Sequence, residues 1–239
     1  MQSALGFADA HIHMVDTASK GGYSDMDRAV MLFSCSAHRS DWEILSEVSD
    51  SRCVRFYGIH PWYADEWSDD SSDALRSMLD ADPSAGVGEI GLDSRHASCP
   101  MSIQKVAFQE QLDIASAHRR AANIHNIGCD ADILNAIRSC RGTVAILHAF
   151  SSESYVKPFS DLGCYFSINR RILARSDARL MRLMGSIPRD RILLESDAPF
   201  TPGFTGMHDF ATELARRIGV SADDLISDST DNAARIIHV

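Results

Sequence analysis

Eight short apolar runs of β type recur along the 239 residues of the chain, with helix-like segments between them. The runs cover residues 7–13, 29–36, 54–60, 86–91, 121–125, 143–150, 164–169 and 192–197. Eight strands that alternate with helices in a chain of this length predict an α/β fold, a closed (β/α)8 barrel of TIM type. A doubly wound open sheet is the second choice, because such sheets usually contain fewer strands.

The segments between the runs carry helix signals. In residues 103–120, Phe108, Leu112 and Ala115 recur at intervals of four and three, which places them on one helical face. Ser221, followed by two aspartates before Leu225, resembles a capping box. Because no internal repeat, low-complexity tract or linker interrupts the alternation, we expect a single domain over residues 1–239.

Composition limits the compartment and the partners of the chain. The apolar runs are too short to span a membrane, and the N-terminus lacks the basic and apolar regions of a secretory signal. We therefore expect a cytoplasmic protein without a membrane partner, whose six cysteines are reduced. The formal net charge of -10 disfavours a broad electrostatic grip on nucleic acid, so a polyanionic substrate requires a local positive centre.

Histidines and carboxylates gather at the ends of the predicted strands, where barrel enzymes carry their chemistry. They are His11, His13, His60, Glu89, Asp93, His125, His148, Glu195 and Asp197. The period of two along a strand points His11 and His13 in one direction, and likewise Glu195 and Asp197. Imidazole and carboxylate groups bind divalent metals, and a buried cluster of them without a metal would be costly. If these faces look into the barrel mouth, four of the histidines and two or three of the carboxylates converge. Six candidate ligands exceed the needs of one tetrahedral ion and favour a two-metal centre.

Each of these residues also has a purely structural interpretation. An isolated histidine is often only hydrogen-bonded, Asp197 before Ala198 suits a turn, and His60 before a proline suits an ordered loop. Glu89 differs, because a carboxylate within a buried strand pattern needs a partner. The joint occurrence of these residues at successive strand ends favours the metal interpretation.

Seven sequence blocks resemble, in order, the signature blocks of the TatD family of metal-dependent hydrolases. They read DAHIH from Asp9, YGIHPWY from Tyr57, GVGEIGLD from Gly86, NIHN from Asn123, ILHAFSS from Ile146, YFSIN from Tyr165 and RILLESDAPFTP from Arg191. The closing DNAARI, from Asp231, matches as well. TatD proteins are similar to the wider amidohydrolase superfamily, and the resemblance implies a TIM-type barrel with a divalent metal centre.

The resemblance also implies a ligand set for two divalent ions, which would be Mg, Mn or Zn. One ion would be held by His11, His13, Glu89 and Asp197, and the second by Glu89, His125 and His148. Glu89 would therefore bridge the two ions. Some superfamily members bridge with a carboxylated lysine, but none of the three lysines here falls at a predicted strand end.

Members of the TatD family are described mostly as magnesium-dependent deoxyribonucleases, which implies that a metal-activated water hydrolyses a phosphodiester of DNA or short nucleic acid. Asp197 would take the proton of this water, and Glu89 would be the other catalytic carboxylate. The remaining polar residues near the strand ends are expected to support the ligands or to contact the substrate. These are His60, Trp62, Asp93, Arg170 and Glu195.

The chain departs from the family pattern at positions where the usual family residues would favour binding of DNA. Ile127 stands where the family often has an arginine, Ser94 stands where an aromatic is common, and residues 203–209 contain no lysine or arginine. In the other direction, residues 170–191 contain seven arginines and two aspartates. They begin at the end of the seventh run, so Arg170 and Arg171 would lie at the barrel mouth, whereas the later ones equally suit a solvated helix face.

Two other functions therefore remain open beside a deoxyribonuclease. One is a metal-dependent hydrolase of a small-molecule amide, lactone or phosphoester that uses the same two-metal centre. The other is a barrel retained only as a metal-binding or interaction module. Trp62 and Tyr63 suit either stacking on a base or packing at the top of the barrel.

Overall fold

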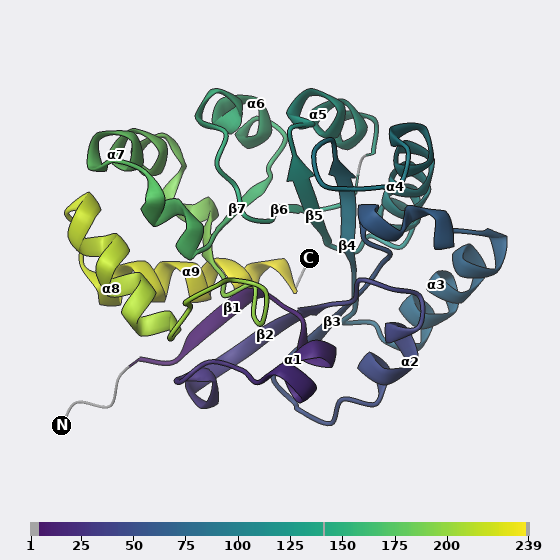
Figure 1. Ribbon diagram of the computed structural model, residues 1–239, viewed down its shortest axis with the longest axis horizontal. Coiled ribbons are helices and arrows are strands. Elements are labelled where there is room, and N and C mark those ends of the chain that lie inside the picture. Colours follow the sequence, from purple (N-terminus) through teal and green to yellow (C-terminus); the bar gives the residue numbers. More distant parts are fainter. Residues whose placement is uncertain (1–4, 141, 238–239) are drawn as a thin grey trace.

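The computed structural model describes residues 5–140 and 142–237 and contains a sheet of eight parallel strands surrounded by helices (Figure 1). The strands are β1 (Phe7–Ile12), β2 (Ala29–Cys35), β3 (Cys53–Tyr57), β4 (Gly86–Asp93), β5 (Ala122–Ile127), β6 (Ala145–Leu147), β7 (Tyr165–Ile168) and β8 (Ile192–Leu194). They pair in chain order, and a parallel bridge between Ile12 and Ala198 joins β1 to the segment after β8. The predicted eight strands and TIM-type barrel are confirmed.

The helices alternate with these strands as predicted. They are α1 (Met14–Lys20), α2 (Asp41–Ser46), α3 (Asp69–Ala81), α4 (Met101–Ala117), α5 (Asp130–Ser139), α6 (Val156–Ser160), α7 (Asp177–Ser186), α8 (Met207–Ile218) and α9 (Ala222–Ile236). Short 3-10 turns add η1 (Met26–Arg28), η2 (Pro61–Glu66), η3 (Glu153–Tyr155), η4 (Arg170–Ala174) and η5 (Arg189–Arg191). No helix within residues 5–140 or 142–237 is both long and apolar enough to cross a membrane.

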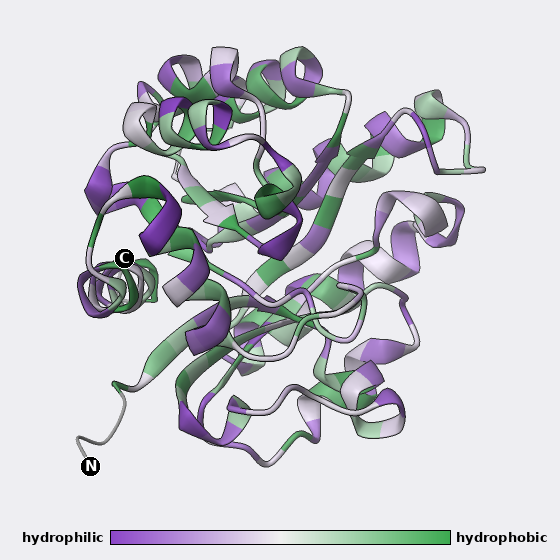
Figure 2. Ribbon diagram, turned by 60° about the vertical axis from the view of Figure 1, so that its left-hand side comes forward, coloured by the Kyte–Doolittle hydropathy of each residue, from purple (hydrophilic) through white to green (hydrophobic). Residues whose placement is uncertain are grey.

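Local sequence signals account for two of these helices. Phe108, Leu112 and Ala115 of α4 are all buried, as their spacing predicts. Ser221 is the N-cap of α9, and its side chain accepts a hydrogen bond from the backbone N–H of Asp224. Hydrophobic residues are concentrated on the central strands, and the helices carry both hydrophobic and hydrophilic residues (Figure 2). This distribution is typical of helices that pack one face against a barrel.

Helix α9 covers the seam between β8 and β1. The side chains of Ser229 and Thr230 accept hydrogen bonds from the backbone N–H groups of Leu194 and Ala8, respectively. Ala233 of the same helix belongs to a buried cluster with Phe33 of β2 and residues of five other strands. Because strands from different sides of a ring can meet only through its interior, this cluster is the apolar filling of the barrel.

Candidate metal centre

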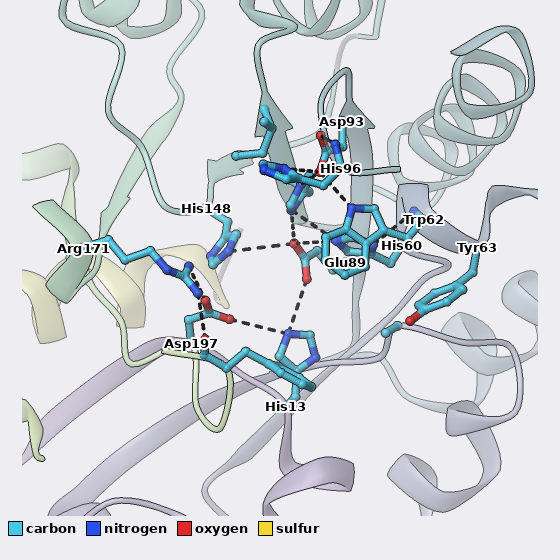
Figure 3. Close-up of a pocket in the computed structure, with 14 residues that line it drawn as sticks. His13, His60, Trp62, Tyr63, Glu89, Asp93, His96, His148, Arg171 and Asp197 are labelled. Atoms are coloured by element: carbon cyan, nitrogen blue, oxygen red, sulfur yellow. Dashed lines mark hydrogen bonds and ion pairs between the residues drawn. The ribbon is translucent and has the colours of Figure 1, made fainter. Parts of the chain in front are cut away.

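A pocket of about 490 Å³ collects the predicted ligands beyond the carboxyl ends of the strands (Figure 3). It is lined by His13, Glu89, His125, His148 and Asp197, among others. His11 is fully buried and reaches the same group through its contacts with His13 and Glu89. The six ligand positions predicted from the sequence therefore lie together in space.

The first group of potential ligand atoms comes from His11, His13 and Glu89. Nε2 of His11 lies 3.1 Å from Nε2 of His13, and these atoms lie 3.3 Å and 3.4 Å from Oε2 of Glu89. Ligand atoms that each bind one tetrahedral ion at roughly 2.0–2.2 Å lie about 3.3–3.6 Å from one another. The spacing of these three lone-pair donors therefore fits a divalent ion at their centre.

The buried surroundings of His11 and His13 support this fit. Nδ1 of His11 lies 2.9 Å from Oδ1 of Asn123, which accepts the Nδ1 proton and leaves the Nε2 lone pair directed at the group. Nδ1 of His13 is buried and has no hydrogen-bond partner within the described part of the chain. Both rings come from the end of one strand, because His11 lies in β1 and His13 directly follows its last residue, Ile12, as the N-cap of α1.

The second group of potential ligand atoms comes from His60, Glu89 and His125. Oε1 of Glu89 lies 2.8 Å from Nδ1 of His125 and 3.6 Å from Nε2 of His60, and Nε2 of His148 lies 3.9 Å from the same oxygen. Glu89 thus points one carboxylate oxygen toward each group, as a bridging ligand requires. Burial lowers the pKa of His60 well below its usual value, which keeps the ring neutral and able to bind a metal.

His60 is a potential ligand that the sequence assigned only to a supporting role. Strand β3 ends at Tyr57, and His60 is the N-cap of the short turn η2, so its ring enters the pocket from a loop. Its distance to Oε1 of Glu89 is shorter than that of the predicted ligand His148. The signal available in the sequence was the position of this histidine immediately before Pro61, which fixes the start of the turn.

Asp93 lies behind the second group of potential ligands and orients the side chains of His125 and Trp62. Its Oδ2 lies 3.3 Å from Nε2 of His125 and accepts a 2.8 Å hydrogen bond from the indole N–H of Trp62. Burial alone would raise the pKa of Asp93, but these contacts and two backbone N–H groups hold it far below its usual value. The ionised Asp93 therefore accepts the Nε2 proton of His125 and leaves Nδ1 facing Glu89.

Glu195 has the corresponding position beside His148. Its Oε1 lies 2.9 Å from Nδ1 of His148 and accepts a hydrogen bond from the backbone N–H of Ala149. Glu195 is fully buried and does not line the pocket, whereas Asp197 does. Strand β8 ends at Leu194, so the strand alternation that would point both carboxylates in one direction does not continue to these residues.

Asp197 lies at the edge of the first group. Its Oδ1 is 3.8 Å from Nε2 of His13, and its Oδ2 accepts a 2.6 Å hydrogen bond from Nη1 of Arg171. The backbone N–H of Asp197 bonds to the carbonyl of His11, which ties the segment after β8 to β1. Its φ of 52° lies in the left-handed region, which aspartate tolerates better than most residues.

The two neighbouring arginines of η4 occupy different positions. Arg171 lines the pocket, whereas Arg170, which was expected beside the substrate, does not. Trp62, Tyr63, His96 and Phe200 also line it, and Trp62 and Phe200 are 42% and 44% exposed. Asn169 accepts a hydrogen bond from the backbone N–H of Arg171 and so begins this turn. An asparagine before two arginines is the sequence signal for such a turn, but it does not say which arginine faces inward.

Known proteins similar to this chain include nucleases and metal-dependent hydrolases. A family model described as TatD related DNase matches residues 8–238. A 3'-5' ssDNA/RNA exonuclease TatD from Cronobacter turicensis is 33% identical over 62% of this chain, and the match covers 58% of that relative's length. An uncharacterized metal-dependent hydrolase, YabD of Bacillus subtilis, is 24% identical over 76% of each chain. The crystal structure of YJJV, a TatD homolog from Escherichia coli K12, superposes with a TM-score of 0.83 at 21% identity over 98% of each chain.

Proposed function

The chain belongs to the family of TatD-related DNases, and on this premise we propose that it is a metal-dependent phosphodiesterase that removes nucleotides from single-stranded nucleic acid. The observation that carries the proposal is the position of Glu89, whose two oxygens face two separate groups of histidines in one pocket. Relatives named 3'-5' ssDNA/RNA exonuclease TatD supply the class of substrate.

We propose two divalent ions, Mg, Mn or Zn, in this pocket. His11, His13, Glu89 and Asp197 would hold one, and Glu89, His125 and His148 the other, with His60 as a further ligand of the second. Such ions supply an activated water and neutralise the negative charge that develops on the phosphoryl oxygens. They also explain how a chain with a formal net charge of -10 accepts a phosphate locally.

The residues of the chain then have separate tasks. Oδ1 of Asp197, the oxygen that Arg171 does not hold, accepts the proton of the attacking water and returns it to the leaving oxygen. Asp93 and Glu195 keep His125 and His148 in the orientation in which one ring nitrogen faces Glu89. Trp62, whose indole N–H is fixed on Asp93, offers its exposed ring to a base of the substrate.

The test is cleavage of a single-stranded oligonucleotide labelled at its 5' end by protein loaded with Mg, Mn or Zn. We expect a ladder of products shortened from the 3' end, and a loss of at least about 100-fold in rate for Glu89→Gln and for Asp197→Asn. Glu43→Gln, at an exposed position of α2, is the matched control and should cleave like the wild type. Absence of cleavage with every metal, by wild type and variants alike, would overturn the proposal.

A second candidate function is hydrolysis of a small-molecule amide, lactone or phosphoester. It is favoured by one observation, the presence of a single arginine and no lysine among the described residues that line the pocket. A panel of small esters, lactones and phosphoesters separates the two functions. Faster, chelator-sensitive hydrolysis of one of these than of the oligonucleotide would select the second function.

A further inference from the structure

Arg171 is the residue whose position the proposed chemistry leaves unexplained. Within the described residues, it supplies the only guanidinium or ammonium group that lines the pocket. It approaches from η4, on the side of Glu89 opposite Trp62 and Tyr63, with the carboxylate of Asp197 between it and His13 (Figure 3). Its charge therefore lies beside the metal ligands but not among them.

The guanidinium of Arg171 is fixed in place by two acceptors. Nη1 donates to Oδ2 of Asp197 at 2.6 Å, and Nη2 donates to the backbone carbonyl of Phe200 at 2.9 Å. A guanidinium has five N–H groups, and the side chain of Arg171 is still 49% exposed. The contacts to Asp197 and Phe200 leave donors for a further acceptor, and a planar group held in this way is suited to bind an oxyanion through two hydrogen bonds.

The two carboxylate oxygens of Asp197 have different contacts. Oδ2 holds Arg171, whereas Oδ1 faces His13. Arg171 can therefore keep its position when Oδ1 takes part in the chemistry. Since Asp197 lies between the guanidinium and the first group of ligands, an anion bound by Arg171 would be a neighbour of the group that is cleaved.

The rest of the pocket offers no substitute for this charge. Ile127 lines it with an apolar side chain, and residues 203–209, after the eighth strand, contain no lysine or arginine. The other lining residues of the described chain are carboxylates, histidines, aromatics and Ala37. The positive charge available to a second anionic group thus depends on one side chain.

We propose that Arg171 binds the internucleotide phosphate next to the one that is hydrolysed, so that the site selects substrates with at least two adjacent phosphates. This inference rests on the proposed phosphodiesterase function and deepens it. A simple phosphodiester would occupy the reaction site without reaching Arg171. A chain of nucleotides would gain the additional charged hydrogen bonds.

The experiment compares two substrates, a single-stranded decanucleotide and bis(p-nitrophenyl) phosphate, which has one phosphate. In Arg171→Gln we expect KM for the decanucleotide to rise about tenfold or more, because the variant loses the charged hydrogen bonds to the neighbouring phosphate. Its loss of kcat/KM with bis(p-nitrophenyl) phosphate, which reports only the contact of Arg171 with Asp197, should be at least about fivefold smaller than its loss with the decanucleotide. Arg171→Lys should recover part of the loss, because it keeps the charge without the planar fork. Arg179→Gln, at an exposed position of α7 outside the pocket, is the matched control.

A purely structural role of Arg171 would give another result. If Arg171 only holds Asp197, Arg171→Gln should lose activity equally on both substrates and should bind Mn2+ more weakly in calorimetry. That outcome would overturn the inference.

If the wild type cleaves neither substrate, the proposed function fails, and binding then tests the inference by itself. Fluorescence anisotropy of a labelled decanucleotide should still show about tenfold weaker binding by Arg171→Gln than by the wild type. Equal affinity would overturn it.

Discussion

Oε1 of Glu89 lies 2.8 Å from Nδ1 of His125, while Oε2 of the same carboxylate faces His11 and His13 on the other side. One buried side chain on β4 thus connects two groups of potential ligands that come from different strands of the barrel.

Replacement of Glu89 by glutamine should separate the two groups. The amide keeps the shape of the side chain but has only one oxygen to offer, so it cannot bridge two cations. We expect the number of Mn2+ ions bound per chain to fall from two to one or none, measured by isothermal titration calorimetry. Two ions bound with unchanged affinity by Glu89→Gln would contradict the bridging role.

Metal removal should destabilise the folded chain. Most of the proposed ligands, among them His13, Glu89 and Asp197, are buried. An ion that binds only the folded state adds about 2.7 kcal/mol at a concentration of 100 Kd. The unfolding midpoint should fall when EDTA is added and return with excess Mn2+, followed by circular dichroism. His13→Ala should reduce the difference in unfolding midpoint between the protein with EDTA and the protein with Mn2+. His118→Ala, at the end of α4 and outside the pocket, should leave this difference unchanged.

Asp93→Asn should weaken metal binding although it replaces none of the proposed metal ligands. The amide can donate to Nε2 of His125, which favours the tautomer that places the proton on Nδ1, the atom facing Glu89. Loss of such a supporting carboxylate typically costs about 10–100-fold in metal affinity or activity. Calorimetry with Mn2+ measures the change, and Asp223→Asn at an exposed position of α9 is the control. Equal affinity of Asp93→Asn and the wild type would exclude this role.

Gly91 should tolerate no side chain. Its φ of 145° is a conformation that other residues rarely adopt, and an added Cβ would lie 2.0 Å from the carbonyl oxygen of His125. Gly91→Ala should therefore lower the free energy of unfolding by about 3 kcal/mol, measured by urea denaturation. Gly185→Ala, in α7 with open space around the new Cβ, should raise it by about 0.5–1 kcal/mol.

The pair Asp50 and Arg52 should contribute to the loss of stability in acid. Hydrogen bonds from the Arg52 guanidinium lower the pKa of Asp50 below its usual value. A carboxyl whose pKa is lowered in the folded state stabilises the protein above its unfolded pKa, and this contribution disappears as the pH falls through the folded pKa. Asp50→Asn should therefore unfold more easily near neutral pH but lose less stability below about pH 4. Asp73→Asn, at an exposed position of α3, should retain the wild-type slope.

The fold could be predicted because the sequence patterns that specify its strands and helices are local and recur along the chain. Each strand is a short apolar run, and the closed barrel follows from their number and from the helices between them. His11 and His13 could be paired for the same reason, because strand alternation predicts one direction for residues two apart and the two rings do meet at the end of β1.

Other parts of the site depend on backbone geometry outside the strands. His60 reaches the pocket from η2, after β3 has ended, and Asp197 follows the end of β8 with a positive φ. Strand periodicity therefore gives no direction for either side chain. Whether Arg170 or Arg171 faces the pocket depends on a short 3-10 turn, in which successive side chains point in very different directions.

The central claim is that Glu89 lies between two divalent ions. Anomalous diffraction from crystals of the Mn2+-loaded protein tests it most directly, because each bound ion appears as a separate peak. We predict two peaks, one against His11 and His13 and one against His125, with an oxygen of Glu89 on each. A fully loaded crystal with no peak in contact with Glu89 would contradict the claim.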